Sequence, residues 1–181
     1  MNFSKILRNG LLVLLATISI TSCKNETVHE PLAEHLALEN AEKQLTDNLK
    51  MYESIWLDVI NKREIDRINE TSFDAEVVLV SSPENIVGIQ AVKDFYQNYL
   101  TGFSDMTITY LDVFGQGNKI VKHWRFEGTH TGSFFGIPAS GKMVNITGVT
   151  LVEMKDGKIA KEENFLDNLA FYQQLGILPT E

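Results

Sequence analysis

The sequence contains only one cysteine, Cys23, among its 181 residues. A single cysteine excludes an intramolecular disulfide, so an apolar core has to hold the fold together. Basic residues are also scarce, because 16 Lys and Arg stand against 24 Asp and Glu and give a net charge of −8. Nucleic-acid-binding surfaces need clustered positive charge to neutralise phosphates. We therefore expect no nucleic-acid partner.

The sequence also lacks the usual signatures of metal and nucleotide sites. Four histidines are present, but they do not have the spacing of zinc or iron ligands. No glycine-rich phosphate loop follows a predicted strand, because the regularly spaced glycines from Gly128 to Gly136 fall in a predicted hairpin. We expect no metal and no other cofactor.

No apolar run is long enough for a permanent transmembrane helix, which needs about 20 residues. The apolar run from Leu11 to Ile20 is shorter and follows Lys5 and Arg8, and no acidic residue precedes Glu26. This order of a basic segment and a short apolar segment is typical of a signal peptide. We assign residues 1–22 to it.

Cys23 ends the string ISITSC, which resembles the lipobox of bacterial lipoproteins. The resemblance implies cleavage before Cys23 and attachment of lipid to its sulfur and new amino terminus, whose acyl chains would anchor the protein stably. The alternative is a chance cysteine in an ordinary secretory signal. The sequence predicts export to the bacterial cell envelope, a lipid anchor to the membrane, a polar tether at 23–31 and one domain at 32–181.

Apolar residues recur every three or four positions in two segments of the domain, which predicts amphipathic helices. The first segment runs from Leu38 to Val59, and a shorter helical segment follows at 64–69. The second stripe begins near Ile89 and is rich in aromatic residues, including Phe95, Tyr96 and Tyr99. Such a stripe is usually core packing, and the alternative is that one tyrosine hydroxyl points into a pocket.

The second half of the sequence alternates between apolar and polar residues, which predicts strands. Strands are expected at 76–80, 106–114, 119–131 and 158–167, and the segment 124–150 is a long hairpin whose loop is rich in Gly, Pro and Ser. Asp156 and Gly157 predict a two-residue turn, and 169–175 a closing helix. Helices followed by a meander of strands predict an α+β domain, in which about three helices cover a curved antiparallel sheet that encloses an apolar pocket.

The string WRFEGTHTGSFFGIPASGK at 124–142, with DGKI from Asp156 and LDNLAFYQQLG from Leu166, resembles the SnoaL-like polyketide cyclase (ester cyclase) family. This resemblance covers roughly Leu49 to Gly176. It implies the cone-shaped fold shared with nuclear transport factor two and ketosteroid isomerase. Since this superfamily hosts many chemistries, the fold by itself does not determine the reaction.

The resemblance implies a cofactor-free reaction, in which a carboxylate removes a proton next to a carbonyl group. Such a base needs a pKa raised by apolar surroundings. The last predicted strand supplies Glu162, Glu163 and Asp167. Strict alternation puts Glu163, Phe165 and Asp167 on one face with Ile159, and we predict Asp167 as the base. The alternative is that Asp167 caps the closing helix.

His130 lies in the string THTG and shares the parity of Trp124 and Phe126. It is the second predicted catalytic residue, as a hydrogen-bond donor to a carbonyl or enolate oxygen, and the alternative is a core histidine. The predicted pocket residues are Trp124, Phe126, Tyr99 and Asn164. The last strand departs from the family pattern, because Glu163 and Asn164 stand where a tryptophan followed by an acid is common, and an asparagine cannot act as a base.

The sequence thus predicts a lipid-anchored SnoaL-like domain that acts as a cofactor-free cyclase, isomerase or lyase on a small carbonyl compound. The alternative is a lipoprotein that binds a small apolar molecule or another protein without chemistry. Export favours the alternative, since polyketide synthesis is usually cytosolic. Homodimerisation through the exposed face of the sheet is compatible with both functions.

Overall fold

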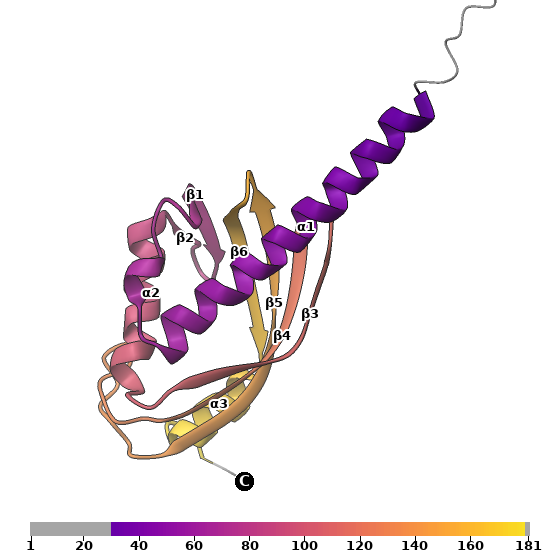
Figure 1. The fold of residues 1–181 in the computed structure, drawn as a ribbon. Helices are drawn as coiled ribbons and strands as arrows, with labels where there is room; N and C mark the ends of the chain where they lie inside the picture. The colour runs from indigo at the N-terminus through magenta and orange to yellow at the C-terminus, as the bar shows by residue number, and fades with distance from the viewer. Residues whose placement is uncertain (1–29, 180–181) are drawn as a thin grey trace, which may run out of the picture.

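The computed structural model describes residues 30–179, so the predicted signal peptide and Cys23 lie outside the described residues. The first helix begins at Glu30, inside the range expected for the tether. The elements follow in the order α1 (Glu30–Asn61), a 3₁₀ turn η1 (Ile65–Arg67), β1 (Phe73–Val80), β2 (Ile86–Val87), α2 (Ile89–Gly102), β3 (Thr107–Gln116), β4 (Lys119–Thr129), β5 (Met143–Lys155), β6 (Lys158–Leu166) and α3 (Asn168–Leu175). Figure 1 shows the sheet curving around the space that α1 and α2 cover. This arrangement confirms the predicted α+β class.

The six strands form one sheet in the order β2-β1-β6-β5-β4-β3. Neighbouring strands are antiparallel except for β1 and β6, which run parallel. The sheet is therefore mixed, and the expectation of a wholly antiparallel sheet was wrong on this point. The sequence pattern of β1 predicts a strand but does not indicate which strand pairs with it. The path of the β3–β6 meander through the fold places β6 beside β1.

The long hairpin predicted around Trp124 is confirmed by the pairing of β4 with β5. Their register runs from Lys119 opposite Glu153 to Thr129 opposite Met143. The predicted alternation holds along both strands, because Ile120, Trp124, Phe126, Val144, Ile146 and Val152 are all buried on the inner face. The turn predicted at Asp156 and Gly157 is also present, with φ of 51° and 75° at these two residues.

The face assignment of β6 differs from strict alternation. Met154 pairs with Ile159 and Glu153 pairs with Lys161, so Ala160 is an extra residue in β6. This bulge shifts the parity of all later residues in the strand. As a result Glu162 is buried like Ile159, whereas Phe165 is exposed. The prediction that Glu163 and Phe165 share the face of Ile159 was therefore wrong.

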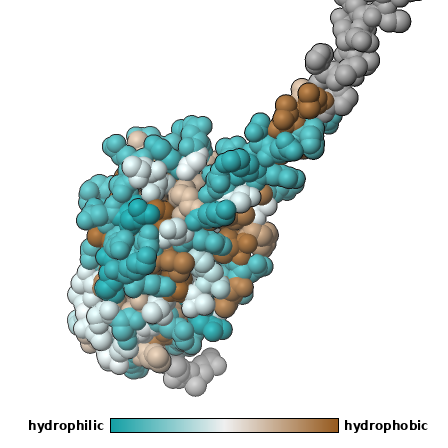
Figure 2. All heavy atoms as spheres, viewed as in Figure 1, coloured by the Kyte–Doolittle hydropathy of each residue, from teal (hydrophilic) through white to brown (hydrophobic). Residues whose placement is uncertain are grey.

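Helix α1 has two different halves. Its C-terminal half buries Tyr52, Ile55, Trp56 and Val59 against the inner face of the sheet, as its apolar stripe predicts. Its N-terminal half projects beyond the sheet (Figure 1), and Figure 2 shows apolar surface on this projecting part. Leu32, Leu36 and Leu38 are exposed there. Within residues 30–179, the helices are too short or too polar to cross a membrane.

Candidate functional site

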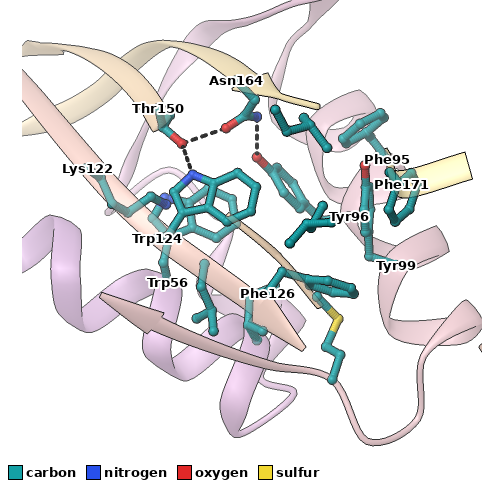
Figure 3. A pocket seen from close by; sticks show the side chains of 15 residues that line it. Trp56, Phe95, Tyr96, Tyr99, Lys122, Trp124, Phe126, Thr150, Asn164 and Phe171 are labelled. Atoms are coloured by element: carbon teal, nitrogen blue, oxygen red, sulfur yellow. Dashed lines mark hydrogen bonds between the residues drawn. The ribbon is translucent and has the colours of Figure 1, made fainter. Parts of the chain in front are cut away.

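A small cavity of about 80 Å³ lies between the inner face of the sheet and the helices that cover it. Its walls are mostly aromatic and aliphatic, and its few polar side chains come from α2, β4, β5 and β6 (Figure 3). The lining residues are Trp56, Ile60, Phe95, Tyr96, Tyr99, Met106, Ile108, Lys122, Trp124, Phe126, Ile146, Thr150, Asn164, Leu166 and Phe171. An apolar cavity with a few convergent polar groups is typical of a small-molecule site.

A larger cleft of about 770 Å³ adjoins this cavity. The two spaces share five lining residues: Phe95, Tyr99, Asn164, Leu166 and Phe171. The rest of the cleft is lined by the end of β1 and the two residues after it, the loop at 134–137, Glu163 of β6 and α3. The shared side chains therefore place the cleft directly beside the cavity.

A chain of four hydrogen bonds crosses the polar end of the cavity, and Figure 3 shows the part of it that runs from Trp124 to Tyr96. Trp124 Nε1 donates to Thr150 Oγ1 over 2.9 Å, and Thr150 Oγ1 donates to Asn164 Oδ1 over 2.6 Å. Asn164 Nδ2 then donates to the Tyr96 hydroxyl over 3.4 Å, and this hydroxyl donates to Glu162 Oε2, also over 3.4 Å. The chain connects the cavity wall to a carboxylate behind it.

The direction of this chain follows from its first donor. An indole N–H can only donate, so the Thr150 hydroxyl accepts from Trp124 and has its own proton free for Asn164 Oδ1. With its oxygen occupied, the Asn164 amide presents its NH₂ group to the Tyr96 oxygen. The hydroxyl proton of Tyr96 is then directed at Glu162. Each donor in the chain therefore orients the next one.

Glu162 is 1% exposed and accepts three hydrogen bonds from side chains of the helices. Tyr52 Oη and Trp56 Nε1 donate to its Oε1 over 2.7 and 2.9 Å, and Tyr96 donates to its Oε2. Burial raises the pKa of the Glu162 carboxyl, while the nearby Lys122 charge and the three donors oppose this rise. A buried carboxyl with a raised pKa, in contact with the cavity wall, is suited to accept a proton.

Lys122 is 4% exposed and extends into the cavity from β4. Its Nζ lies 4.9 Å from the ring centre of Tyr52, 5.1 Å from that of Trp56 and 5.7 Å from that of Tyr110. Within the described residues, this Nζ has no hydrogen-bond or salt-bridge partner. Burial lowers the pKa of the Lys122 amine to about 8, although the Glu162 charge acts in the opposite direction.

The structure places Asp167, the base predicted from the sequence, at the N-cap of α3. Its side chain is exposed and accepts a hydrogen bond from the Ala170 amide over 2.9 Å. It does not line the cavity or the adjoining cleft. This position matches the capping role that the sequence left open as the alternative.

The structure places His130 in the core beside Phe103 and Phe134, and outside the cavity lining. Its ring is fully buried, and its Nδ1 lies 3.1 Å from Ser140 Oγ and accepts from the Ser140 amide over 3.3 Å. Its backbone amide also donates to the Lys142 carbonyl. His130 therefore joins the two ends of the loop between β4 and β5.

All four predicted pocket residues line the cavity: Trp124, Phe126, Tyr99 and Asn164. The sequence did not single out Lys122, although it has the same parity in β4 as Ile120 and Trp124. A lysine on an inner face is uncommon, and only alternation could have located it. Glu162 was considered but not favoured, because the bulge at Ala160 cannot be read from the alternation.

The family model for the SnoaL-like polyketide cyclases matches residues 46–175, which include every residue of this cavity. The chain belongs to the SnoaL-like polyketide cyclase family. Its members adopt the curved sheet and helical cover seen in this SnoaL-like domain. Comparison of the sequence with curated proteins gives no match.

Solved structures of similar shape support the fold. A SnoaL-like protein from Jannaschia sp. CCS1 has 23% identity and a TM-score of 0.64, with 74% of this chain and 94% of that chain covered. TsrD from Streptomyces laurentii has 23% identity and a TM-score of 0.65, with coverages of 72% and 96%. TerC, co-crystallised with polyporic acid, has 18% identity and a TM-score of 0.57, with coverages of 72% and 98%. At these identities the similarity shows the fold alone.

Proposed function

We propose that this SnoaL-like domain binds a small, largely apolar carbonyl compound and catalyses a cofactor-free proton transfer of the cyclase or isomerase type next to the carbonyl group. The chain of hydrogen bonds from Trp124 to Glu162 is the observation that carries this proposal. It directs the Tyr96 hydroxyl, which lines the cavity, at a buried carboxyl group. The family membership supports the same type of reaction.

In the proposed reaction, Tyr96 accepts the proton from the substrate carbon as it gives its own proton to Glu162. Burial holds the pKa of the Tyr96 phenol well above its ordinary value, so this residue stays protonated at rest and acts as a relay. The Lys122 ammonium lines the same cavity and stabilises the negative charge that develops on the carbonyl oxygen. The aromatic walls exclude water and strengthen this interaction.

We expect Tyr96→Phe to lower the rate of proton transfer by about 100-fold, because the carbon acid loses its connection to Glu162. The measurement is deuterium incorporation from D₂O into 1-phenylpropan-2-one, a small apolar ketone, followed by NMR. Asp167→Asn is the matched control. Asparagine caps a helix as well as aspartate does, so this variant should keep both its stability and its exchange rate.

The two variants also separate the two predicted bases. If Asp167→Asn lost exchange while Tyr96→Phe kept it, the base would be Asp167 and the relay through Tyr96 would be wrong. Because Phe retains the aromatic packing of Tyr96 against Trp56, whose ring centre lies 4.4 Å away, a loss of exchange in Tyr96→Phe does not reflect a collapsed cavity.

A second candidate function is binding without chemistry. It is favoured because, within residues 30–179, the side chains that line the cavity include no carboxylate. Trp56 and Trp124 both line it, so quenching of tryptophan fluorescence by the ketone would report binding. Quenching without deuterium exchange in the wild-type protein would identify this SnoaL-like domain as a binding module.

We further propose that the domain is exported and held to the membrane by lipid on Cys23. The support comes from the signal-peptide pattern and the lipobox-like string before Cys23. The expected result is that the protein made in a bacterial host partitions into the detergent phase, whereas Cys23→Ser partitions into the aqueous phase. Equal partitioning of the two proteins would contradict a lipid anchor.

The outer face of the sheet supports the proposal of a homodimer. Leu111, Phe114, Leu151 and Phe165 are exposed large apolar side chains on β3, β5 and β6. Exposed apolar area of this kind favours association with a second copy. Sedimentation of the 32–181 domain as a monomer at micromolar concentration would rule out this assembly.

A further inference from the structure

We propose that the Lys122 side chain forms an imine with an aldehyde or an unhindered ketone that enters the cavity. This inference rests on the proposed function, because it concerns the same cavity and the same class of carbonyl ligand. It adds a covalent step at Lys122, a residue to which neither the family name nor the sequence pattern gives a role.

The geometry of Lys122 carries the proposal. Its side chain is almost fully buried, lines the cavity and reaches it from the middle of a rigid strand. Three aromatic rings, those of Tyr52, Trp56 and Tyr110, surround its Nζ at 4.9 to 5.7 Å. Within residues 30–179 no acceptor binds this nitrogen, so no hydrogen bond has to break before it attacks a carbonyl carbon.

The surroundings of Lys122 also raise the fraction of the neutral amine that such an attack requires, although the ammonium form still predominates at pH 7. Burial removes water from the amine, which disfavours the ammonium form and lowers the pKa to about 8. Desolvation of this kind activates lysines that form imines in other proteins. Glu162 is the acidic group that opposes this effect, and Tyr52 and Tyr110 face the amine as neutral phenols whose pKa values are raised by burial.

The reaction balances without an oxidant or a reductant. Lys122 Nζ first loses a proton to solvent, and its lone pair then forms a bond to the carbonyl carbon. Transfer of one proton from nitrogen to oxygen gives a carbinolamine, which loses water to leave the C=N bond. Protonation of the imine nitrogen gives an iminium, which takes over the role of the Lys122 ammonium in this covalent route. It withdraws electrons from the adjacent carbon and makes the proton on that carbon easier for Tyr96 and Glu162 to remove.

The test traps the imine with a reductant. The purified protein is incubated at pH 7 with benzaldehyde and sodium cyanoborohydride, and the modified lysines are located by peptide mass spectrometry. We expect one benzyl group on Lys122 at a yield at least tenfold above that on Lys119, an exposed lysine of the same strand. Lys122→Arg keeps the positive charge but cannot form a stable imine, so it should lose this adduct and keep the labelling of Lys119.

Each result decides the proposal. Preferential labelling of Lys122 supports imine formation whether or not the protein exchanges deuterium into 1-phenylpropan-2-one. The labelling test is therefore independent of the proton relay through Tyr96. If Lys122 is labelled no more than Lys119, the imine proposal is wrong. This holds also when benzaldehyde quenches the fluorescence of Trp56 and Trp124, which would show that it enters the cavity without forming the imine. Circular dichroism of Lys122→Arg checks that the variant is folded.

Discussion

Glu162→Leu is expected to destabilise the protein by about 3–5 kcal/mol, the typical cost of removing one member of a buried charged network. The substitution leaves Tyr52 Oη and Trp56 Nε1 buried without an acceptor, since both donate to Glu162 Oε1. It also leaves the Lys122 ammonium without the nearby negative charge that favours it. Urea unfolding at pH 7 measures the loss.

Two matched variants test the reason for this loss. Glu162→Gln keeps a side-chain oxygen for Tyr52 and Trp56, so it should cost only about 1–2 kcal/mol. Glu163→Leu changes the neighbouring acid on the opposite face of β6 and should alter stability by less than about 0.5 kcal/mol. If Glu162→Leu were no more costly than Glu163→Leu, the hydrogen-bonded network would not contribute to the fold.

The Gln variant also gives a pH test of the buried carboxyl group. The pKa of Glu162 is raised in the folded protein above its ordinary value of 4.5, so the folded state binds more protons than the unfolded state as pH rises above 4.5. This residue therefore contributes stability at low pH that is lost as pH rises through the folded pKa. We expect the stability of Glu162→Gln to improve relative to wild type between pH 4.5 and 7.

Gly148→Ala is expected to destabilise the protein by about 1–3 kcal/mol and to weaken ligand binding by about tenfold or more. A Cβ at this position would lie 2.4 Å from Trp124 Cζ2 and 2.8 Å from the Phe165 carbonyl oxygen. The carbonyl belongs to the backbone of β6 and cannot move easily, so the indole ring has to shift. The bond from Trp124 to Thr150 would then break at the start of the chain that orients Tyr96.

Urea unfolding and quenching of tryptophan fluorescence by 1-phenylpropan-2-one measure the two effects. Thr147→Ala, at the exposed neighbouring position in β5, is the control and should change neither by a measurable amount. Combining Gly148→Ala with Trp124→Leu should cost less than the sum of the two single changes by about 1 kcal/mol, because the smaller side chain removes the clash. Strict additivity would show that the clash with Trp124 is not the cause.

The elements of this domain could largely be predicted from its sequence. The helical stripe of α1, the alternation in β4 and β5, and the turn at Asp156 and Gly157 all depend on local spacing, and all are present. The short strand β2 was not predicted, because two residues cannot show an alternation. The parallel pairing of β1 with β6 depends on residues about 80 positions apart, so local patterns could not indicate it.

The candidate site was also predictable only in part, because contacts between residues far apart in the sequence cannot be inferred from local patterns. Alternation pointed to Trp124 and Phe126, and the helical stripe pointed to Tyr99. The structure brings these three side chains together with Asn164 at one cavity. Alternation could not assign Glu162, because the bulge at Ala160 reverses the parity of β6. Its burial also depends on Tyr52 and Trp56, which lie more than 100 positions earlier in the chain.

The sequence by itself determined the helices, the long hairpin and the family, because these follow from the periodicity of apolar residues and from a contiguous motif. The tertiary structure decided which charged groups meet at the cavity. Asp167 caps α3 at the surface, whereas Lys122 and Glu162 are enclosed by aromatic side chains from α1, α2 and β3. Burial and the contacts across the fold set the charge state of such groups, and neither can be read from the neighbours of a residue along the chain.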